Sequence, residues 1–163
     1  MKVELRKFNI TDYFKILRLV LNRNYSGEFS QSFFKYIYQG VKNIFAGNRL
    51  YKFAILVNKK LAGSVGLFKI KKDYELGYFV LKEFRNKGVA TQASKKVLDF
   101  AFKKLKLKKV IAITDINAKF SEKILRKLRF KKMRENKKEK EFIWERKKWK
   151  YYLSASITGS EAR

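Results

Sequence analysis

The chain contains neither cysteine nor histidine among its 163 residues. The absence of cysteine excludes a disulfide framework and a thiol nucleophile. Without either residue type the chain lacks the usual zinc ligands, so no metal site is predicted, and it also lacks the imidazole that most often acts as acid or base in catalysis. Any acid–base chemistry must therefore use a carboxylate, a tyrosine, a lysine, a serine or water.

Long apolar runs are also absent, and none approaches the length of a membrane span. The first residues, Met1–Arg6, alternate charged and apolar side chains and lack the apolar segment of a secretion signal. Hydrophobic residues make up 46% of the chain, too many for a disordered protein. We therefore expect a cytoplasmic protein with no membrane contact. One domain is predicted over residues 1–150, and the Ser, Gly and Ala content of residues 151–163 indicates a flexible or vector-derived tail.

Acidic residues are scarce: 14 stand against 41 basic ones, which gives a net charge of +27. One interpretation is a polyanionic partner, such as a ribosome or another RNA-rich particle. The other is compositional bias, because the excess is mostly lysine and the chain has no proline, as an AT-rich genome would encode. Both interpretations stay open. In either case a positive charge of this size would favour the binding of a cofactor that carries several phosphates.

The stretch from Tyr74 to Phe102 combines a strand, a short loop and a helix. Residues 75–81 are rich in aromatic and aliphatic side chains, as expected of a strand. Apolar residues recur at three- and four-residue steps from residue 90 to residue 105, which predicts an amphipathic helix. The loop over residues 85–90 opens onto the helix N-terminus, where unpaired N–H groups and the helix dipole favour an anion. Its glycine and basic side chains fit a phosphate.

The other elements follow from hydrophobic periodicity and from turn and capping residues. In chain order we predict a strand over 3–8, a helix capped by Thr11, a second helix from about 30 to 47, a hairpin of strands 50–57 and 61–70, a strand over 110–114 buried on both faces, a helix capped by Asn117, and a hairpin of strands 130–133 and 141–146. A strand–helix–strand step requires a parallel pair, so the predicted fold class is α/β (α+β) with a mixed sheet.

The loop from Arg85 to Ala90 reads R-x-x-G-x-A and resembles the pyrophosphate-binding motif Q/R-x-x-G-x-G/A of the GNAT superfamily of N-acetyltransferases. With its flanks it reads YELGYFVLKEFRNKGVATQASKKVLDFAF, which is similar to the pattern ELGYW-x5-GKG-ATEA-x-AF of the Rim-type subgroup, whose founders acetylate ribosomal-protein N-termini. The resemblance covers about residues 2–148. It implies acetyl-CoA as the cofactor and a GNAT-like, mostly antiparallel central sheet flanked by helices in the order β-α-α-β-β-β-α-β-α-β-β.

The resemblance also implies which residues bind the cofactor. The backbone of the central strand would pair with the pantetheine arm, and the loop amides with their flanking residues would hold the pyrophosphate. The residues so implied are Phe79, Val80, Leu81, Arg85, Asn86, Lys87, Gly88, Val89, Ala90, Thr91 and Asn117, the last as a pantetheine contact. The sequence departs from the family twice: Asn117 and Ser121 are spaced N-x-x-x-S rather than N-x-x-S, and Arg129 stands where a glycine is expected.

Two residues are catalytic candidates by the same resemblance. Glu75 would deprotonate the amine, directly or through water, and Ser121 would lie near the sulfur of the leaving thiolate. Glu28 and Tyr78 are candidates for contact with the acceptor. The alternatives are a solvated strand charge at Glu75, a loop charge at Glu28 and an ordinary helix serine at Ser121.

We expect direct attack by the acceptor amine without an acyl-enzyme, because no activated nucleophile is visible. The expected acceptor is a protein amine, either an N-terminus or a lysine, and the expected assembly is a monomer or a homodimer. Two alternatives remain. One is a basic protein that binds RNA or the ribosome without catalysis, and the other is a degenerate acetyltransferase that only binds acetyl-CoA.

Overall fold

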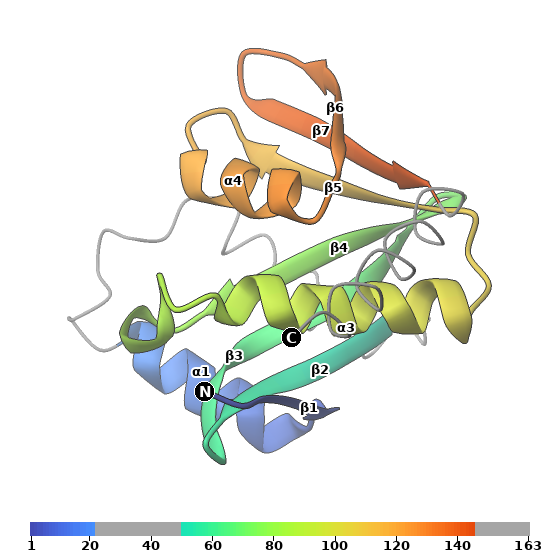
Figure 1. Ribbon diagram of the computed structural model, residues 1–163. Coiled ribbons are helices and arrows are strands. Elements are labelled where there is room, and N and C mark those ends of the chain that lie inside the picture. The colour runs from blue at the N-terminus through green and yellow to red at the C-terminus, as the bar shows by residue number, and fades with distance from the viewer. Residues whose placement is uncertain (22–49, 146–163) are drawn as a thin grey trace, which may run out of the picture.

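The computed structural model of the protein describes residues 1–21 and 50–145 (Figure 1). Its elements in chain order are β1 (Val3–Lys7), α1 (Ile10–Leu21), β2 (Leu50–Val57), β3 (Lys60–Ile70), β4 (Asp73–Val80), the 3-10 helix η2 (Lys82–Phe84), α3 (Val89–Lys103), β5 (Lys109–Asp115), α4 (Lys119–Lys127), β6 (Lys131–Glu135) and β7 (Glu139–Glu145). The predicted second helix and the tail over 151–163 lie outside the described residues. Within those residues, no helix is both long and apolar enough to span a membrane.

The described strands form one seven-stranded sheet in the order β1-β2-β3-β4-β5-β7-β6. Every neighbouring pair is antiparallel except β4 and β5, which run parallel. The prediction of a mixed, mostly antiparallel sheet is therefore confirmed. The hairpin of β2 and β3 turns through Asn58 and Lys59, which both have positive φ angles, 48° and 65°. Such a two-residue turn matches the twist of the strands that it joins.

Helices α1 and α3 cover opposite faces of the sheet. Tyr51 and Phe53 of β2 stack edge-on against Phe100 of α3, with ring centroids 5.3 and 5.6 Å apart. Lys52 lies between them in the strand, so its side chain points to the other face, where it contacts Tyr13 of α1. Helix α4 shares the α3 face, because its apolar residues belong to the same buried cluster as those of α3, β5 and β7.

Two predicted helix caps are wrong. Helix α1 is capped by Asn9 rather than Thr11: the Asn9 side-chain oxygen accepts a hydrogen bond from the Asp12 N–H, and the Asp12 carboxylate accepts one from the Asn9 N–H. Asp12 is held in place by a two-point ion pair with Arg6, which favours this reciprocal cap. Helix α4 begins after Ala118, with no side-chain cap, and not directly after Asn117.

The C-terminus of α4 is a Schellman motif. The Phe130 N–H donates to the Leu125 carbonyl at 2.9 Å, and the Arg129 N–H donates to the Arg126 carbonyl at 2.8 Å. This motif requires a left-handed residue after the helix, and Arg129 adopts it with a φ of 65°. The glycine expected here would adopt the same conformation without the steric cost of a Cβ atom.

We therefore predict that Arg129→Gly stabilises the protein by about 0.5–1 kcal/mol, since it removes the strain of a left-handed side chain. The free energy of unfolding in urea measures the effect. Arg129→Ala is the control, because alanine keeps the Cβ atom and should not stabilise the protein. Equal stability of the glycine and alanine variants would contradict this account.

Lys52 is a buried amine enclosed by two aromatic rings. Its ammonium nitrogen lies 4.2 Å from the ring centroids of Phe8 and Tyr13, and it donates to the Tyr13 hydroxyl at 3.1 Å. Burial lowers the pKa of Lys52 from 10.5 to about 7, against a smaller opposing effect of Asp12. The native state therefore releases a proton near pH 7 that the unfolded chain holds up to about pH 10.5.

Because the unfolded state binds more protons in this window, Lys52 makes the native state more stable as the pH rises from 7 toward 10.5. We predict that the stability of the wild type relative to Lys52→Met rises by about 1–2 kcal/mol between pH 7 and pH 9, within the limit that a depressed lysine pKa sets. Urea unfolding at both pH values measures it. Parallel pH profiles of the two proteins would show that Lys52 titrates normally.

Candidate functional site

The parallel strands β4 and β5 pair at one end only. Their register contains the single pair Glu75 and Ile111. At the same end the Lys109 ammonium lies 2.9 Å from the Asp73 carboxylate and ties the starts of the two strands together. Beyond this point β4 continues alongside β3 and β5 alongside β7, so the two strands diverge toward their carboxyl ends (Figure 1). In the described part of the chain, no strand pairs with the β5-facing edge of β4 after this end.

The backbone of Val80 faces this diverging edge. The Leu81 N–H donates to the Ala62 carbonyl at 2.8 Å, so the neighbouring Gly63–Val80 pair is a non-hydrogen-bonded one. The N–H and C=O of Val80 consequently point away from β3. The carbonyl accepts a hydrogen bond from Arg85 Nε at 3.0 Å. The Val80 N–H therefore points toward the diverging edge as a hydrogen-bond donor.

The neighbours of Val80 are fixed by packing. A Cβ atom at Gly63 would lie 2.0 Å from the Phe79 carbonyl oxygen, so β3 approaches β4 more closely here than any side chain allows. The side chains of Phe79 and Leu81 are buried, and their backbone groups face β3 by the alternation of the strand. Of the three residues predicted to pair with pantetheine, only Val80 directs its backbone to the diverging edge.

The loop after β4 ends at a helix N-terminus that no side chain caps. Gly88 is the N-cap residue of α3, in the left-handed conformation with a φ of 73°, and the first turn of α3 contains no acidic residue. The nearest atom to a Cβ built on Gly88 is the Gln92 side-chain nitrogen, at 3.7 Å. The flexible end of the Gln92 side chain therefore borders the space beside Gly88 at ordinary contact distance. The first-turn N–H groups of a helix point into such a space and favour a negative charge.

Basic side chains fix the conformation of this loop through hydrogen bonds to backbone carbonyls. Arg85 binds the Val80 carbonyl, as described above, and Lys87 Nζ donates to the Glu83 carbonyl at 2.9 Å. Asn86 adopts a left-handed φ of 59° between them. After the loop, Val89 is buried, whereas Ala90 and Thr91 are half-buried at the start of the helix. The donors, the charge and the glycine together fit a phosphate group.

Tyr78 connects strand β4 to helix α4. Its hydroxyl donates to the Ser121 carbonyl of α4 at 3.4 Å. Burial raises the pKa of Tyr78 to about 12, so the hydroxyl is protonated at neutral pH. Ser121 is half-buried, and Asn117 is exposed in the turn before α4. The structure thus brings Tyr78 and Ser121 together beside the diverging edge.

Glu75 lies on the opposite face of β4. Its neighbours Tyr74 and Leu76 pack in the cluster that contains α3. Because successive side chains of a strand point to opposite faces, the half-buried Glu75 carboxylate points away from α3, whereas Tyr78 points toward it. Glu75 and Ser121 therefore approach the edge from different sides. Glu28 lies outside the described residues.

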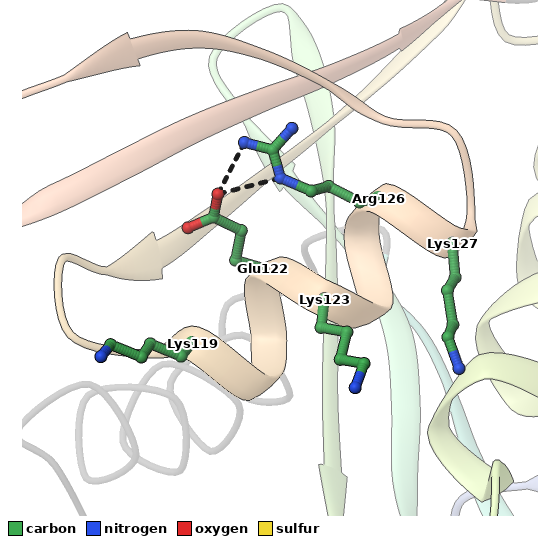
Figure 2. Close-up of a pocket in the computed structure, with 5 residues that line it drawn as sticks. All are labelled: Lys119, Glu122, Lys123, Arg126 and Lys127. Atoms are coloured by element: carbon green, nitrogen blue, oxygen red, sulfur yellow. Dashed lines mark hydrogen bonds and ion pairs between the residues drawn. The ribbon is translucent and has the colours of Figure 1, made fainter.

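A pocket of about 540 Å³ lies along α4 (Figure 2). Its lining residues are Lys119, Glu122, Lys123, Arg126 and Lys127. The Glu122 carboxylate accepts hydrogen bonds from Lys140 at 2.8 Å and from Arg126 at 2.7 and 3.0 Å. The hydrogen bond from Lys140 is the larger cause and that from Arg126 the smaller, and together they lower the pKa of Glu122 to about 2. The pocket is thus lined by lysines beside one carboxylate that is already paired.

The α4 lysines and the role of Arg85 in fixing the loop were not predicted from the sequence. The spacing of Lys119, Lys123 and Lys127, four residues apart in the sequence, places them on neighbouring turns of a helix and could have indicated a basic face. The hydrogen bond from Arg85 to Val80 has no sequence signal, because it depends on where the loop returns to the strand.

Comparison with known proteins places the chain in a family. Residues 2–131 match the acetyltransferase (GNAT) domain. A putative ribosomal N-acetyltransferase, YdaF of Bacillus subtilis, is 34% identical over 59 residues. That match spans 34% of this chain and only 32% of the relative.

Two similar solved structures share the fold at low identity. The spermidine N-acetyltransferase of Vibrio cholerae, in complex with CoA and spermine, has a TM-score of 0.70 at 19% identity, over 90% of this chain and 97% of that one. The N-acetyltransferase PseH of Campylobacter jejuni, in complex with acetyl coenzyme A, has a TM-score of 0.66 at 15% identity, over 88% and 99%. Together with the match over residues 2–131, the diverging β4–β5 pair and the uncapped loop after β4 agree with the predicted GNAT family, to which this chain belongs.

Proposed function

We propose that this protein is an acetyl-CoA-dependent N-acetyltransferase that transfers the acetyl group directly to a primary amine. The observation that carries the proposal is the uncapped α3 N-terminus at Gly88, which opens beside the edge where β4 leaves β5. The membership of the GNAT family and the CoA and acetyl-CoA complexes of the similar structures support acetyl-CoA as the cofactor.

The loop residues from Arg85 to Thr91 would hold the pyrophosphate, and the Val80 N–H would bind the extended arm of the coenzyme. The bound coenzyme would supply the acetyl group as a thioester, whose carbonyl carbon the amine attacks. Backbone N–H groups at a fixed edge can polarise a carbonyl oxygen without reorganising during the reaction. We therefore assign the polarising role to Val80, and Asn117 remains a proposed contact of the coenzyme arm.

Acid and base would act from opposite faces of β4. On one face, the Glu75 carboxylate would take the proton from the attacking amine, directly or through a water. On the other face, the Tyr78 hydroxyl lies beside Ser121, where the leaving thiolate would form. A protonated hydroxyl can donate to a thiolate, so we propose Tyr78 and Ser121 as the groups that stabilise it. This assigns Tyr78 to the thiol side rather than to the acceptor.

The proposed acceptor is a protein amine, at an N-terminus or at a lysine. The name of the Bacillus subtilis relative supports a ribosomal protein, and the similar spermidine enzyme shows that this fold also accommodates a polyamine. A net charge of +27 disfavours the approach of a polycation such as spermidine at low salt. A folded or ribosome-bound protein, with acidic neighbours, meets no such barrier.

Gly88→Asp and Gly88→Asn form a matched pair that tests the cofactor site. Both side chains tolerate the left-handed conformation of Gly88, and only the aspartate adds a negative charge beside the proposed pyrophosphate. We predict that titration calorimetry with acetyl-CoA finds a one-to-one site, weakened at least about tenfold more by Gly88→Asp than by Gly88→Asn, as the loss of charge-assisted hydrogen bonds implies.

The titration should be made at moderately high salt, which suppresses non-specific attraction to the basic surface. Equal, weak binding by all three proteins that salt abolishes would contradict the proposal. It would instead favour the alternative of a basic RNA-binding protein without catalysis.

A transfer assay tests the acceptor and Glu75 together. We predict release of CoA with peptides that carry a free α-amine or a lysine, at a higher kcat/KM than with spermidine. Glu75→Gln should lower kcat by about 100- to 10,000-fold, the usual contribution of a general base, while the affinity for acetyl-CoA stays unchanged. Peptides blocked at both kinds of amine are the control. Preference for spermidine would overturn the protein acceptor, and an unchanged kcat would overturn the role of Glu75.

A further inference from the structure

The basic side of the α4 pocket has no assigned role in the proposed chemistry. We propose that Lys123 and Lys127 bind the 3′-phosphate of coenzyme A, so that the protein selects the 3′-phosphorylated coenzyme over its dephosphorylated form. This inference rests on the proposed function, because it assumes that acetyl-CoA occupies the diverging edge between β4 and β5.

The position of α4 places these lysines across the edge from the phosphate loop. Helix α3 packs on β3 and β4, and α4 packs on β5, so the two helices flank the point where β4 and β5 separate. The two helices also contact each other, and α4 lies over the N-terminal half of α3 (Figure 1). A coenzyme whose pyrophosphate lay at Gly88 would extend its adenosine end toward the facing side of α4.

The side chains of α4 divide into two groups by direction. Figure 2 shows Glu122 and Arg126 pointing toward β7, whereas Lys123 and Lys127 point the other way, toward α3. Lys123 and Lys127 are one helical turn apart, about 6 Å along the axis. Two ammonium groups at this spacing can share one phosphate.

The charges on the two sides differ in the same way. Toward β7, the Glu122 carboxylate is bound by Arg126 and by Lys140, which fixes those two cations to a protein partner. Within residues 1–21 and 50–145, neither Lys123 nor Lys127 takes part in an ion pair, and both side chains are exposed. The side of α4 that faces the coenzyme edge therefore holds positive charge that no described carboxylate neutralises.

The coenzyme offers a group of matching chemistry. Its pyrophosphate links the pantetheine arm to adenosine, and the ribose carries a further phosphate at the 3′ position with up to two negative charges. The loop at Gly88 presents backbone N–H groups for the pyrophosphate, and its two basic side chains, Arg85 and Lys87, already donate to the Val80 and Glu83 carbonyls. Lys123 and Lys127 supply point charges that suit a terminal phosphate, which needs no fixed bidentate geometry.

Binding of CoA and of 3′-dephospho-CoA, measured by titration calorimetry at one moderately high salt concentration, tests the proposal. The wild type is expected to bind CoA at least about tenfold more tightly, as one or two charge-assisted contacts imply. The variant Lys123→Gln with Lys127→Gln should bind both coenzymes with the affinity that the wild type has for the dephospho form. Lys123→Arg with Lys127→Arg should keep most of the preference.

Lys59→Gln with Lys60→Gln is the matched control, since it removes the same charge from two exposed lysines of the β2–β3 turn. This control should keep the full preference, which excludes an effect of net charge. Equal binding of both coenzymes by the wild type would overturn the inference and leave the cofactor site intact, and so would a preference that survives in the glutamine variant. Binding of neither coenzyme by the wild type would overturn the proposed function itself, and the inference with it.

Discussion

The single register pair of β4 and β5 is the constraint on which the site depends. The ion pair of Lys109 with Asp73 and the pairing of Glu75 with Ile111 hold the strands together at one end. Each strand is then satisfied by its other neighbour, β3 or β7, and follows that neighbour's twist. If β5 had continued beside β4, the backbone N–H and C=O of Val80 would have formed hydrogen bonds with β5. The divergence leaves the Val80 N–H pointing toward the edge inside an otherwise complete sheet.

The scarcity of acidic residues determines where positive charge accumulates. On the side of α4 and the last hairpin, three described carboxylates pair with neighbouring cations: Glu122 with Arg126 and Lys140, Glu135 with Lys132, and Glu141 with Arg134. Exposed pairs of this kind add little stability. Their effect is on the electrostatic field: they neutralise the side toward β7, while the lysines on the side toward α3 have no carboxylate partner within the described residues. Compositional bias can explain the excess of positive charge, but these ion pairs distribute it unevenly between the two sides of α4.

Local patterns predicted most of the fold, and features that depend on tertiary contact were missed. The apolar periodicity of α3 and the alternation in β2 and β3 are properties of the chain itself, so the sequence located them to within a few residues. The cap of α1 is different. Thr11 and Asn9 are both good caps, and the choice is made by Asp12, which reaches back to Asn9 because Arg6 on β1 holds it. No short-range rule contains that information.

In the candidate site too, local features were predicted from the sequence and features that depend on tertiary contact were missed. The loop motif at Gly88 was visible because backbone conformation restricts the residue type, and the structure shows the left-handed N-cap that the glycine permits. The hydrogen bond of Tyr78 to α4 was not visible, since it connects elements whose separation follows from the divergence of β4 and β5. The hydrogen bond of Arg85 to Val80 was not visible either, because it depends on where the loop returns to the strand. Arg129 gave a partial signal: its departure from the expected glycine marked a strained position without revealing the Schellman motif that causes the strain.

Strand alternation explains how a chain without histidine or cysteine could separate a base from an acid. Glu75 and Tyr78 are three residues apart on β4, an odd spacing, so their side chains must point to opposite faces. The carboxylate is half-buried on one face, and the hydroxyl, with its pKa raised by burial, is kept protonated on the other. A thioester lying along the edge of β4 would meet the base where the amine arrives and the hydroxyl where the thiolate departs. In that arrangement the strand itself stands between the carboxylate and the hydroxyl and keeps them from exchanging a proton directly.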